Sequence, residues 1–362
     1  MRHLLLTNPS PLLIALVALF VACGPSNTNT KPVTAANGGN GGNGLIGAGS
    51  TFVYPVMTKW IAQFQQAHPG VQINYQSIGS GGGIQQLKKG VVDFGASDAA
   101  LDDKQLQEMP GLVQVAESAG PVCITYNLPN LEKPLRLSGA TLSEIFLGTI
   151  KNWQDPQLKK DNPGVNLPNT GIIVAHRSDG SGTTNIFTNY LSRVNPDWQA
   201  KVGAGIAVSW PVGIGGKGSE GVTGVVKQSP GAIGYVELTY AKENNLPVAV
   251  VKNRAGNYVE PTPEGTTAAI SAYADDLAQD VRKPIVDPPD TAKEAYPIAG
   301  LTYLLIPKEP KDPNKKQMLK DFVHFVITSG QDTAQQLYYA KLPRSLQQQD
   351  ERLINEIATA QP

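Results

Sequence analysis

Cysteine is nearly missing from this chain, which has two cysteines, Cys23 and Cys123, among 362 residues. They do not form the close spacings that hold zinc or an iron–sulfur cluster. Cys123 lies in the run PVCITY at 121–126, which predicts a buried strand with the thiol as a small core side chain. We therefore expect no metal centre and no cofactor.

Net charge is missing as well. Lys and Arg together number 30, Asp and Glu number 30, and the formal net charge is zero. A nucleic acid or an anionic membrane surface as partner would favour a basic protein, so the balance argues against both. A small anionic ligand is not excluded, because it responds to nearby donors and not to the total charge.

Histidine is scarce, and none of the four has a context that supports a general base. His68 precedes a Pro-Gly turn, His176 adjoins Arg177, and His324 lies in a helical stretch. Two glycine motifs also fail on spacing: GGKG at 215–218 lacks the Ser or Thr of a Walker A loop, and GASDA at 95–99 ends in Ala where a nucleophile elbow has Gly. The sequence predicts a protein that is not an enzyme.

Long hydrophobic runs are missing too. The apolar run 12–22 has 11 residues, which is too short to span a bilayer, and it follows the basic Arg2. Residues 1–22 therefore resemble a secretory signal. The run ends FVACG at 20–24, and a small residue before Cys is how bacterial lipoprotein signals end, although Phe20 stands where Leu is usual. We expect a lipid on Cys23; the alternative is an ordinary signal peptide with an incidental cysteine.

The next segment, 23–44, is rich in Asn, Gly, Thr, Pro and Ser and contains a repeated GGN. This composition is typical of a flexible tether. A tether after a lipidated cysteine allows a folded body to reach away from a membrane. With a lipid on Cys23, Cys123 has no partner for a disulfide.

From Leu45 onward, short strand-like and helix-like segments alternate. Strands are indicated by Val71, Ile73 and Tyr75 in alternation, and by apolar runs at 91–94, 172–174, 233–236, 248–251 and 303–306. One helix is expected to open with a capping box made by Thr141 and Glu144. Another has Phe322, Phe325 and Val326 on one face. This alternation predicts α/β sheets whose ligands bind at the carboxyl ends of strands.

Three glycine-rich turns that contain Ser or Thr each lead into a predicted helix. They are GAGSTF at 47–52, GSGGG at 79–83 and RSDGSGTT at 177–184. The start of a helix exposes unpaired N–H donors and the positive end of the helix dipole, and glycine lets the backbone approach a ligand. A capped helix after a turn explains each segment alone. Three of them, one carrying Arg177, indicate a shared site for a tetrahedral oxyanion.

Several longer segments resemble the signature segments of the periplasmic phosphate-binding proteins. The resemblance extends from Leu45 to about Leu346 and is carried by GAGSTF with Pro55, VDFGASD at 92–98, IFLGTIKNW at 145–153, RSDGSGT at 177–183, GGKG at 215–218, PGAIGYVE at 230–237 and the stretch 332–343. Ser50 and Gly81 depart from the commonest family residues, and neither is expected to contact the ligand through its side chain.

The resemblance implies a two-domain α/β fold of the periplasmic-binding-protein type (type II-like), with a hinge and with the ligand between the domains. Domain I would comprise 45–118 and 296–362, and domain II 119–295. It also implies a monomeric receptor that delivers phosphate to an ABC permease with its ATPase. Carried over by position, the ligand contacts would come from Thr51, the Phe52 N–H, Ser80, Asp98, Arg177, Ser181, the Gly182 N–H and Thr183, and Asp179 would pair with Arg177.

Asp98 is the unusual member of this set, because it places a carboxylate beside an anion. Near neutral pH, phosphate keeps a P–OH that can donate a hydrogen bond to Asp98, whereas sulfate is fully ionised. A site built around such a donor rejects a ligand lacking it by about 10⁴–10⁵. Two alternatives stay open: a binding protein for sulfate or molybdate, which Asp98 disfavours, and a secreted phosphatase or hydrolase, for which no nucleophile–base pair is visible.

Overall fold

The computed structural model describes residues 44–129 and 131–357. The expected signal 1–22, the lipidation site Cys23 and the tether up to residue 43 lie outside these residues. Gly44, assigned above to the tether, begins the first strand. The strands are β1 Gly44–Gly49, β2 Gln72–Ser77, β3 Phe94–Ser97, β4 Leu112–Tyr126, β5 Arg136–Leu137, β6 Ile173–Arg177, β7 Ile214–Gly216, β8 Ala232–Glu237, β9 Val250–Lys252, β10 Tyr258–Val259 and β11 Ala299–Pro307.

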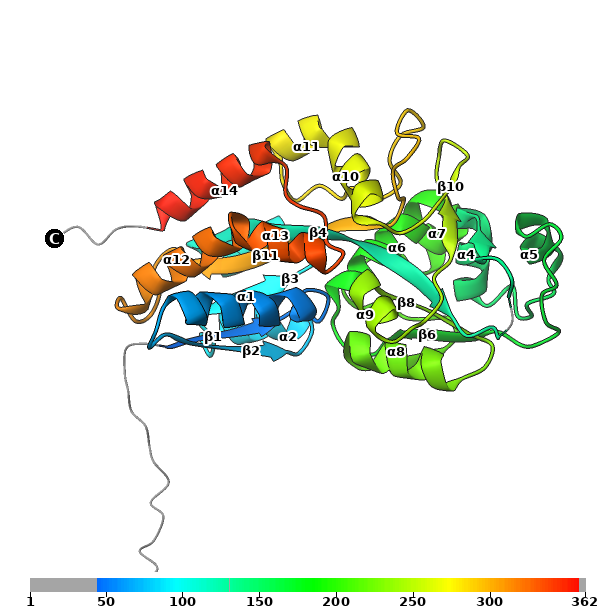
Figure 1. Cartoon of the computed structure of the whole chain (residues 1–362), viewed down its shortest axis with the longest axis horizontal. Helices are drawn as coiled ribbons and strands as arrows, with labels where there is room; N and C mark the ends of the chain where they lie inside the picture. Colours follow the sequence, from blue (N-terminus) through cyan, green and yellow to red (C-terminus); the bar gives the residue numbers. More distant parts are fainter. Residues whose placement is uncertain (1–43, 130, 358–362) are drawn as a thin grey trace, which may run out of the picture. The chain divides into compact units, whose positions relative to one another are not determined.

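Helices alternate with these strands over the described ranges (Figure 1). They are α1 Tyr54–Ala67, α2 Ser80–Lys88, α3 Asp103–Glu108, α4 Gly139–Leu147, α5 Pro156–Asp161, α6 Gly182–Val194, α7 Pro196–Lys201, α8 Gly218–Gln228, α9 Leu238–Glu243, α10 Pro263–Ala272, α11 Ala274–Gln279, α12 Lys315–Ile327, α13 Gly330–Gln336 and α14 Arg344–Glu356. None of the described helices is both long and apolar enough to cross a membrane.

Eight strands form one mixed sheet in the order β2-β1-β3-β11-β4-β8-β6-β7. We call the part built on β1, β2 and β3 the first lobe and the part built on β6, β7 and β8 the second lobe. Strand β4 connects them, because its first part pairs with β11 and its last part, Val122–Tyr126, pairs with β8. In Figure 1 the first lobe carries α1 and α2, and the second carries α6, α8 and α9.

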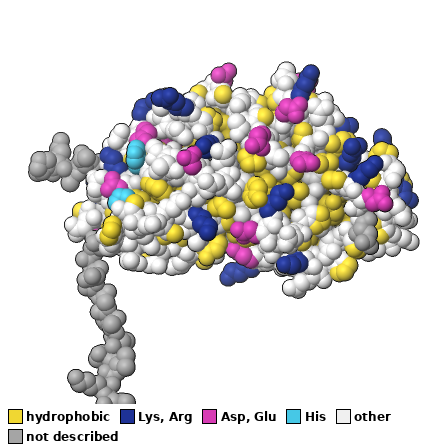
Figure 2. Space-filling view, in the orientation of Figure 1, with side chains coloured by type: hydrophobic (Ala, Val, Ile, Leu, Met, Phe, Trp, Pro, Cys, Tyr) yellow, Lys and Arg dark blue, Asp and Glu magenta, His cyan; other side chains and the backbone are white. Residues whose placement is uncertain are grey.

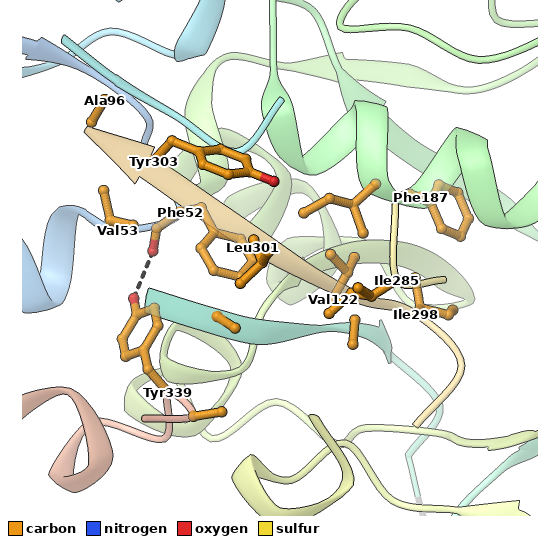
Figure 3. Packing of buried hydrophobic residues seen from close by; sticks show 14 of the residues in the cluster. Phe52, Val53, Ala96, Val122, Phe187, Ile285, Ile298, Leu301, Tyr303 and Tyr339 are labelled. Atoms are coloured by element: carbon orange, nitrogen blue, oxygen red, sulfur yellow. Dashed lines mark hydrogen bonds between the residues drawn. The ribbon is translucent and has the colours of Figure 1, made fainter. Parts of the chain in front are cut away.

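The main hydrophobic cluster extends through both lobes and includes residues of β4 and β11. Phe52, Leu301 and Val122 lie together there, and the Tyr339 hydroxyl donates to the Phe52 carbonyl at 2.6 Å (Figure 3). Cys123 is fully buried in β4, which confirms the strand expected for it.

Most of the sequence-based expectations for local structure are confirmed, and three are wrong. Helix α4 begins at Gly139, and its cap is Ser138, whose Oγ accepts from the Thr141 N–H at 3.2 Å; Thr141 and Glu144 form no capping box at its start. In the run 91–94 the strand begins only at Phe94, and Val91 is 59% exposed. Ser80, placed above in a turn, is the first residue of α2.

The face of the surface in view carries both signs of charge in mixture (Figure 2). On the face in view, Lys and Arg side chains lie between Asp and Glu side chains and form no single basic or acidic field. Among the described residues, no group of three or more His, Cys, Asp or Glu is arranged to hold a metal ion.

Candidate functional site

The first glycine-rich segment lies at the carboxyl end of β1. A Cβ on Gly49 would stand 2.0 Å from the Ala96 carbonyl, so only glycine lets β1 end so close to β3. The chain then turns through Ser50, Thr51 and Phe52 into α1, and all three residues are buried. The Phe52 N–H donates to Ser50 Oγ at 3.0 Å.

The second segment ends at Ser80, the first residue of α2. Gly79 has a φ of 84°, in the region that favours glycine, and a Cβ there would meet the Asp179 carboxylate of the second lobe at 2.3 Å. The hydroxyl of Ser80 accepts from the Gly182 N–H at 3.0 Å and from the Asp98 N–H at 3.3 Å. Ser80 therefore lies between the two lobes, at the N-termini of two helices.

The third segment follows β6 and opens α6. Ser181 caps the helix, and its Oγ accepts from the Thr184 N–H at 3.1 Å. Gly182 lies so close to Asp98 that a Cβ would stand 2.6 Å from the Asp98 backbone nitrogen. Thr183 Oγ1 donates to Asp98 Oδ2 at 3.2 Å. Four segments far apart in the sequence thus meet at one place, where the lobes touch.

Arg177 is the cationic group of the site, and its side chain is 2% exposed. Its Nε and Nη2 donate to Asp179 at 2.8 and 2.5 Å, and Asp179 also accepts from the Gly218 N–H at 3.0 Å. Burial alone would raise the pKa of Asp179, but the hydrogen bonds and charge of Arg177 outweigh it and lower that pKa. Asp179 therefore stays ionised and neutralises Arg177, which keeps three of its five N–H groups for other partners.

Asp98 is the second carboxylate, and no Lys or Arg of the residues that the structure describes forms a hydrogen bond with it. Its Oδ1 accepts from Ser50 Oγ and from Thr302 Oγ1, the latter at 3.3 Å. Burial raises the pKa of Asp98 to about 6, and the hydrogen bond from Ser50, the charge of Arg177 and the hydrogen bonds from Thr183 and Thr302 offset only part of that rise. Asp98 is therefore an acceptor at neutral pH, held among neutral hydroxyl donors.

The structure adds three side-chain contacts at this site that the sequence interpretation did not include. Ser50, whose side chain is expected not to contact the ligand, donates to Asp98 instead. The Ser219 and Thr51 hydroxyls lie 2.8 Å apart across the lobes, and the motif GGKG directly before Ser219 was an available signal. Thr302 lies in β11, 204 residues after Asp98, and no local pattern marks it.

The fold and the site together define a two-lobed α/β binding protein with a small polar site between the lobes. The family model described as a PBP superfamily domain matches residues 29–329. The phosphate-binding protein PstS of Xylella fastidiosa (strain Temecula1) is 44% identical over 308 residues, which are 85% of this chain and 84% of that one. PstS of Haemophilus influenzae is 43% identical, over 83% of this chain and 89% of its own length.

A solved structure agrees in fold. The phosphate-bound periplasmic phosphate-binding protein PfluDING matches 84% of this chain and 92% of its own, with a TM-score of 0.67 and 22% sequence identity. The chain therefore belongs to the PstS family of phosphate-binding proteins within the PBP superfamily. The family model and the structural match confirm the two-domain α/β fold expected from the sequence. Members of this family are substrate-binding proteins, which confirms the expected non-enzymatic class.

Proposed function

We propose that this protein binds inorganic phosphate between its two lobes, outside the cytoplasmic membrane, and delivers it to an ABC permease for uptake. The observation that carries the proposal is the pairing of two opposite groups in one buried site. Arg177, held by Asp179, offers a planar fork that suits two phosphate oxygens. Asp98 offers an acceptor that only a protonated oxyanion can use.

The ligand contacts in this proposal are those expected from the sequence. The first lobe would contribute Thr51, the Phe52 N–H, Ser80 and Asp98, and the second lobe Arg177, Ser181, the Gly182 N–H and Thr183. Every one of these residues is buried, and the hydrogen bonds between them link the two lobes. Arg177 is the charged donor and Asp98 is an acceptor; the other contacts would come from neutral hydroxyl and N–H donors, which stabilise an anion without a counter-charge.

The test is calorimetry on the purified protein with phosphate, arsenate and sulfate. Phosphate and arsenate both keep a proton near neutral pH, so both should bind, and sulfate should not. Tight sulfate binding, or no binding of any of the three, would overturn the proposal. A turnover assay on a phosphate ester runs beside it and should give no product.

We also propose that a hinge on the connecting strands joins domain I, 45–118 with 296–362, to domain II, 119–295. The support is the path of β4, which leaves β11 for β8 close to the first boundary, between residues 121 and 122. A strand that crosses between lobes forms a natural bending point, because the rest of each lobe packs on its own helices.

A lipid on Cys23 and a tether from 23 to about 43 complete the proposal, because FVACG at 20–24 follows a short apolar run. The lipid would hold a monomeric receptor near the permease at the membrane. Cys23→Ser should release the protein from the membrane fraction and leave phosphate affinity unchanged. Recovery of the native protein in the soluble fraction with an unmodified Cys23 would overturn the proposed lipid anchor and leave the proposed phosphate binding unaffected.

A further inference from the structure

A second buried acid lies directly behind Asp98. Glu117 belongs to β4 and is fully buried. Its Oε1 lies 3.0 Å from Thr302 Oγ1, and the same hydroxyl lies 3.3 Å from Asp98 Oδ1. Glu117 Oε2 has no hydrogen-bond partner among the described residues. One threonine hydroxyl therefore joins a carboxyl outside the site to the carboxylate inside it.

Thr302 has a single hydroxyl hydrogen, so it can donate to only one of the two carboxyls. If Glu117 is ionised, it competes with Asp98 for that hydrogen. If Glu117 is neutral, its own proton can be donated to Thr302 Oγ1, and Thr302 then donates to Asp98. The protonation state of Glu117 thus decides the direction of the hydrogen bonds that reach the ligand site.

The surroundings of Glu117 favour the neutral form. An ionised carboxylate with one neutral donor and one unpartnered oxygen would be poorly stabilised away from water. Burial raises the pKa of Glu117 to about 8; the hydrogen bond from Thr302 opposes the rise and the charge of Asp98 adds to it.

We propose that Glu117 is a positioning residue: as a neutral acid it holds the Thr302 hydrogen on Asp98, and its ionisation sets the alkaline limit of phosphate binding. This inference rests on the proposed function. Ionised Glu117 weakens binding in two ways, because it withdraws a donor from Asp98 and adds a negative charge behind an anion site.

Other groups near Glu117 do not explain such a limit. The Tyr75 hydroxyl donates to the Ser50 carbonyl at 2.9 Å, and burial raises its pKa well above 10, so Tyr75 stays neutral. Asp98 is already ionised at neutral pH, and Arg177 stays charged. Gln331, which donates to the Glu117 backbone carbonyl at 2.8 Å, is uncharged.

Another buried acid, Glu237, provides a matched control for Glu117. Burial also raises the pKa of Glu237 to about 8, and backbone and side-chain hydrogen bonds from Thr239 oppose the rise. Glu237 Oε2 accepts from the Thr239 N–H at 2.8 Å and lies 3.2 Å from the Tyr339 hydroxyl. No hydrogen bond joins Glu237 to Asp98 or Thr302 within the described ranges, so its ionisation should not change the donors on Asp98.

The experiment measures phosphate affinity of the full chain by calorimetry from about pH 7 to about pH 9.5, for the wild type, Glu117→Gln and Glu237→Gln. Above about pH 8, where HPO₄²⁻ stays the predominant form of the ligand, wild-type affinity should fall by about tenfold per pH unit. Glu117→Gln should bind as well as wild type near pH 7 and lose the decline, whereas Glu237→Gln should retain it.

Calorimetry in two buffers of different ionisation enthalpy also measures the number of protons taken up on binding. A variant that only altered packing would not change this number. At about pH 9 the wild type should take up close to one proton on binding phosphate, and Glu117→Gln should take up none. Thr302→Val, which removes the partner of Glu117, should move the decline to higher pH, and Thr302→Ser should restore it.

The inference falls if Glu117→Gln keeps the alkaline decline and the proton uptake of the wild type, or if Glu237→Gln abolishes them. In that case the variants still bind phosphate near pH 7, and the proposed function is supported although this inference is wrong. If no version binds phosphate at any pH, the proposed function and this inference fail together.

Discussion

Asp98 and Asp179 are the same residue type, both influenced by Arg177, yet the two lobes give them opposite properties. Asp179, in the second lobe, accepts from the guanidinium and from the Gly218 N–H, and its pKa is lowered. Asp98, in the first lobe, accepts from hydroxyl groups, and burial raises its pKa to about 6. Asp179 serves the protein's own cation, whereas Asp98 remains an acceptor for the ligand.

The difference between Asp98 and Asp179 indicates that anion recognition at this site does not depend on net positive charge. Arg177 and Asp179 cancel, so the remaining charge of the site is the negative one on Asp98. A fully ionised oxyanion is then repelled, whereas one that keeps a proton is accepted. Selectivity should depend on Asp98 and affinity on the Arg177–Asp179 pair, and variants of Asp98 and Arg177 test that division directly.

The largest effect is expected for selectivity in Asp98→Asn. The amide removes the repulsion and can donate to an oxyanion, so the phosphate-to-sulfate affinity ratio should fall by about a hundredfold or more. Competition calorimetry at fixed ionic strength measures the ratio, because salt screens anion binding independently. Asp179→Asn is the matched variant: it should shift both affinities together. An unchanged ratio in Asp98→Asn would refute this account of specificity.

Arg177→Ala should weaken phosphate binding by about 30-fold or more, because removing one partner of a buried charged contact costs about 2–5 kcal/mol. The measurement is titration calorimetry, with circular dichroism to establish that the variant folds. Arg254→Ala removes an arginine that pairs with Asp287 and whose side chain is 51% exposed, and it should leave affinity unchanged. If folded Arg177→Ala binds phosphate as tightly as the wild type, the phosphate site does not include Arg177 and lies elsewhere in the protein.

Stability of the ligand-free protein should fall as the pH rises. The folded-state pKa is raised to about 8 for Glu117 and Glu237 and to about 6 for Asp98, so the native state holds protons that the unfolded chain has released. Each group then lowers the free energy of unfolding by up to ~1.4 kcal/mol per pH unit between its unfolded and folded pKa values. The stability is recovered on acidification through the same window.

Urea unfolding at several pH values between about 5 and 8 measures this slope. The double variant Glu117→Gln with Glu237→Gln should reduce the slope most strongly in the upper part of this range, because both amides are uncharged throughout. A smaller slope should remain, because burial also raises the pKa values of Asp98 and Asp350. A slope that is the same in the double variant and the wild type would assign the pH dependence to other groups. Lys201→Gln, an exposed change, serves as the control and should leave the slope unchanged.

The smallest expected signal is the change in dimensions on binding. Contacts divided between the lobes, such as Thr183 with Asp98, should close the protein around phosphate and raise its melting temperature by mass action. Small-angle scattering with and without phosphate measures the compaction. Identical dimensions in both states would contradict a hinge on β4 and leave binding itself intact.

Local sequence is enough to predict the parts of the site that lie within one segment. The strand–helix alternation and the glycine-rich turns before α1, α2 and α6 follow from local composition, because glycine conformations and helix starts are decided over a few residues. Arg177 and Asp179 are two residues apart, so their proximity is also local. The resemblance carried by these segments implied the family to which the chain belongs.

The groups that surround Asp98 come together through the order of strands in the sheet and cannot be predicted from local sequence. Strand β11 lies between β3 and β4 although it comes near the end of the chain, and that order brings Thr302 and Glu117 behind the site. Ser50 is near Asp98 for the same reason, because β1 and β3 pair side by side. A side chain's burial and partners, and hence the pKa of Glu117, depend on which strands are neighbours, and sequence spacing does not encode that order.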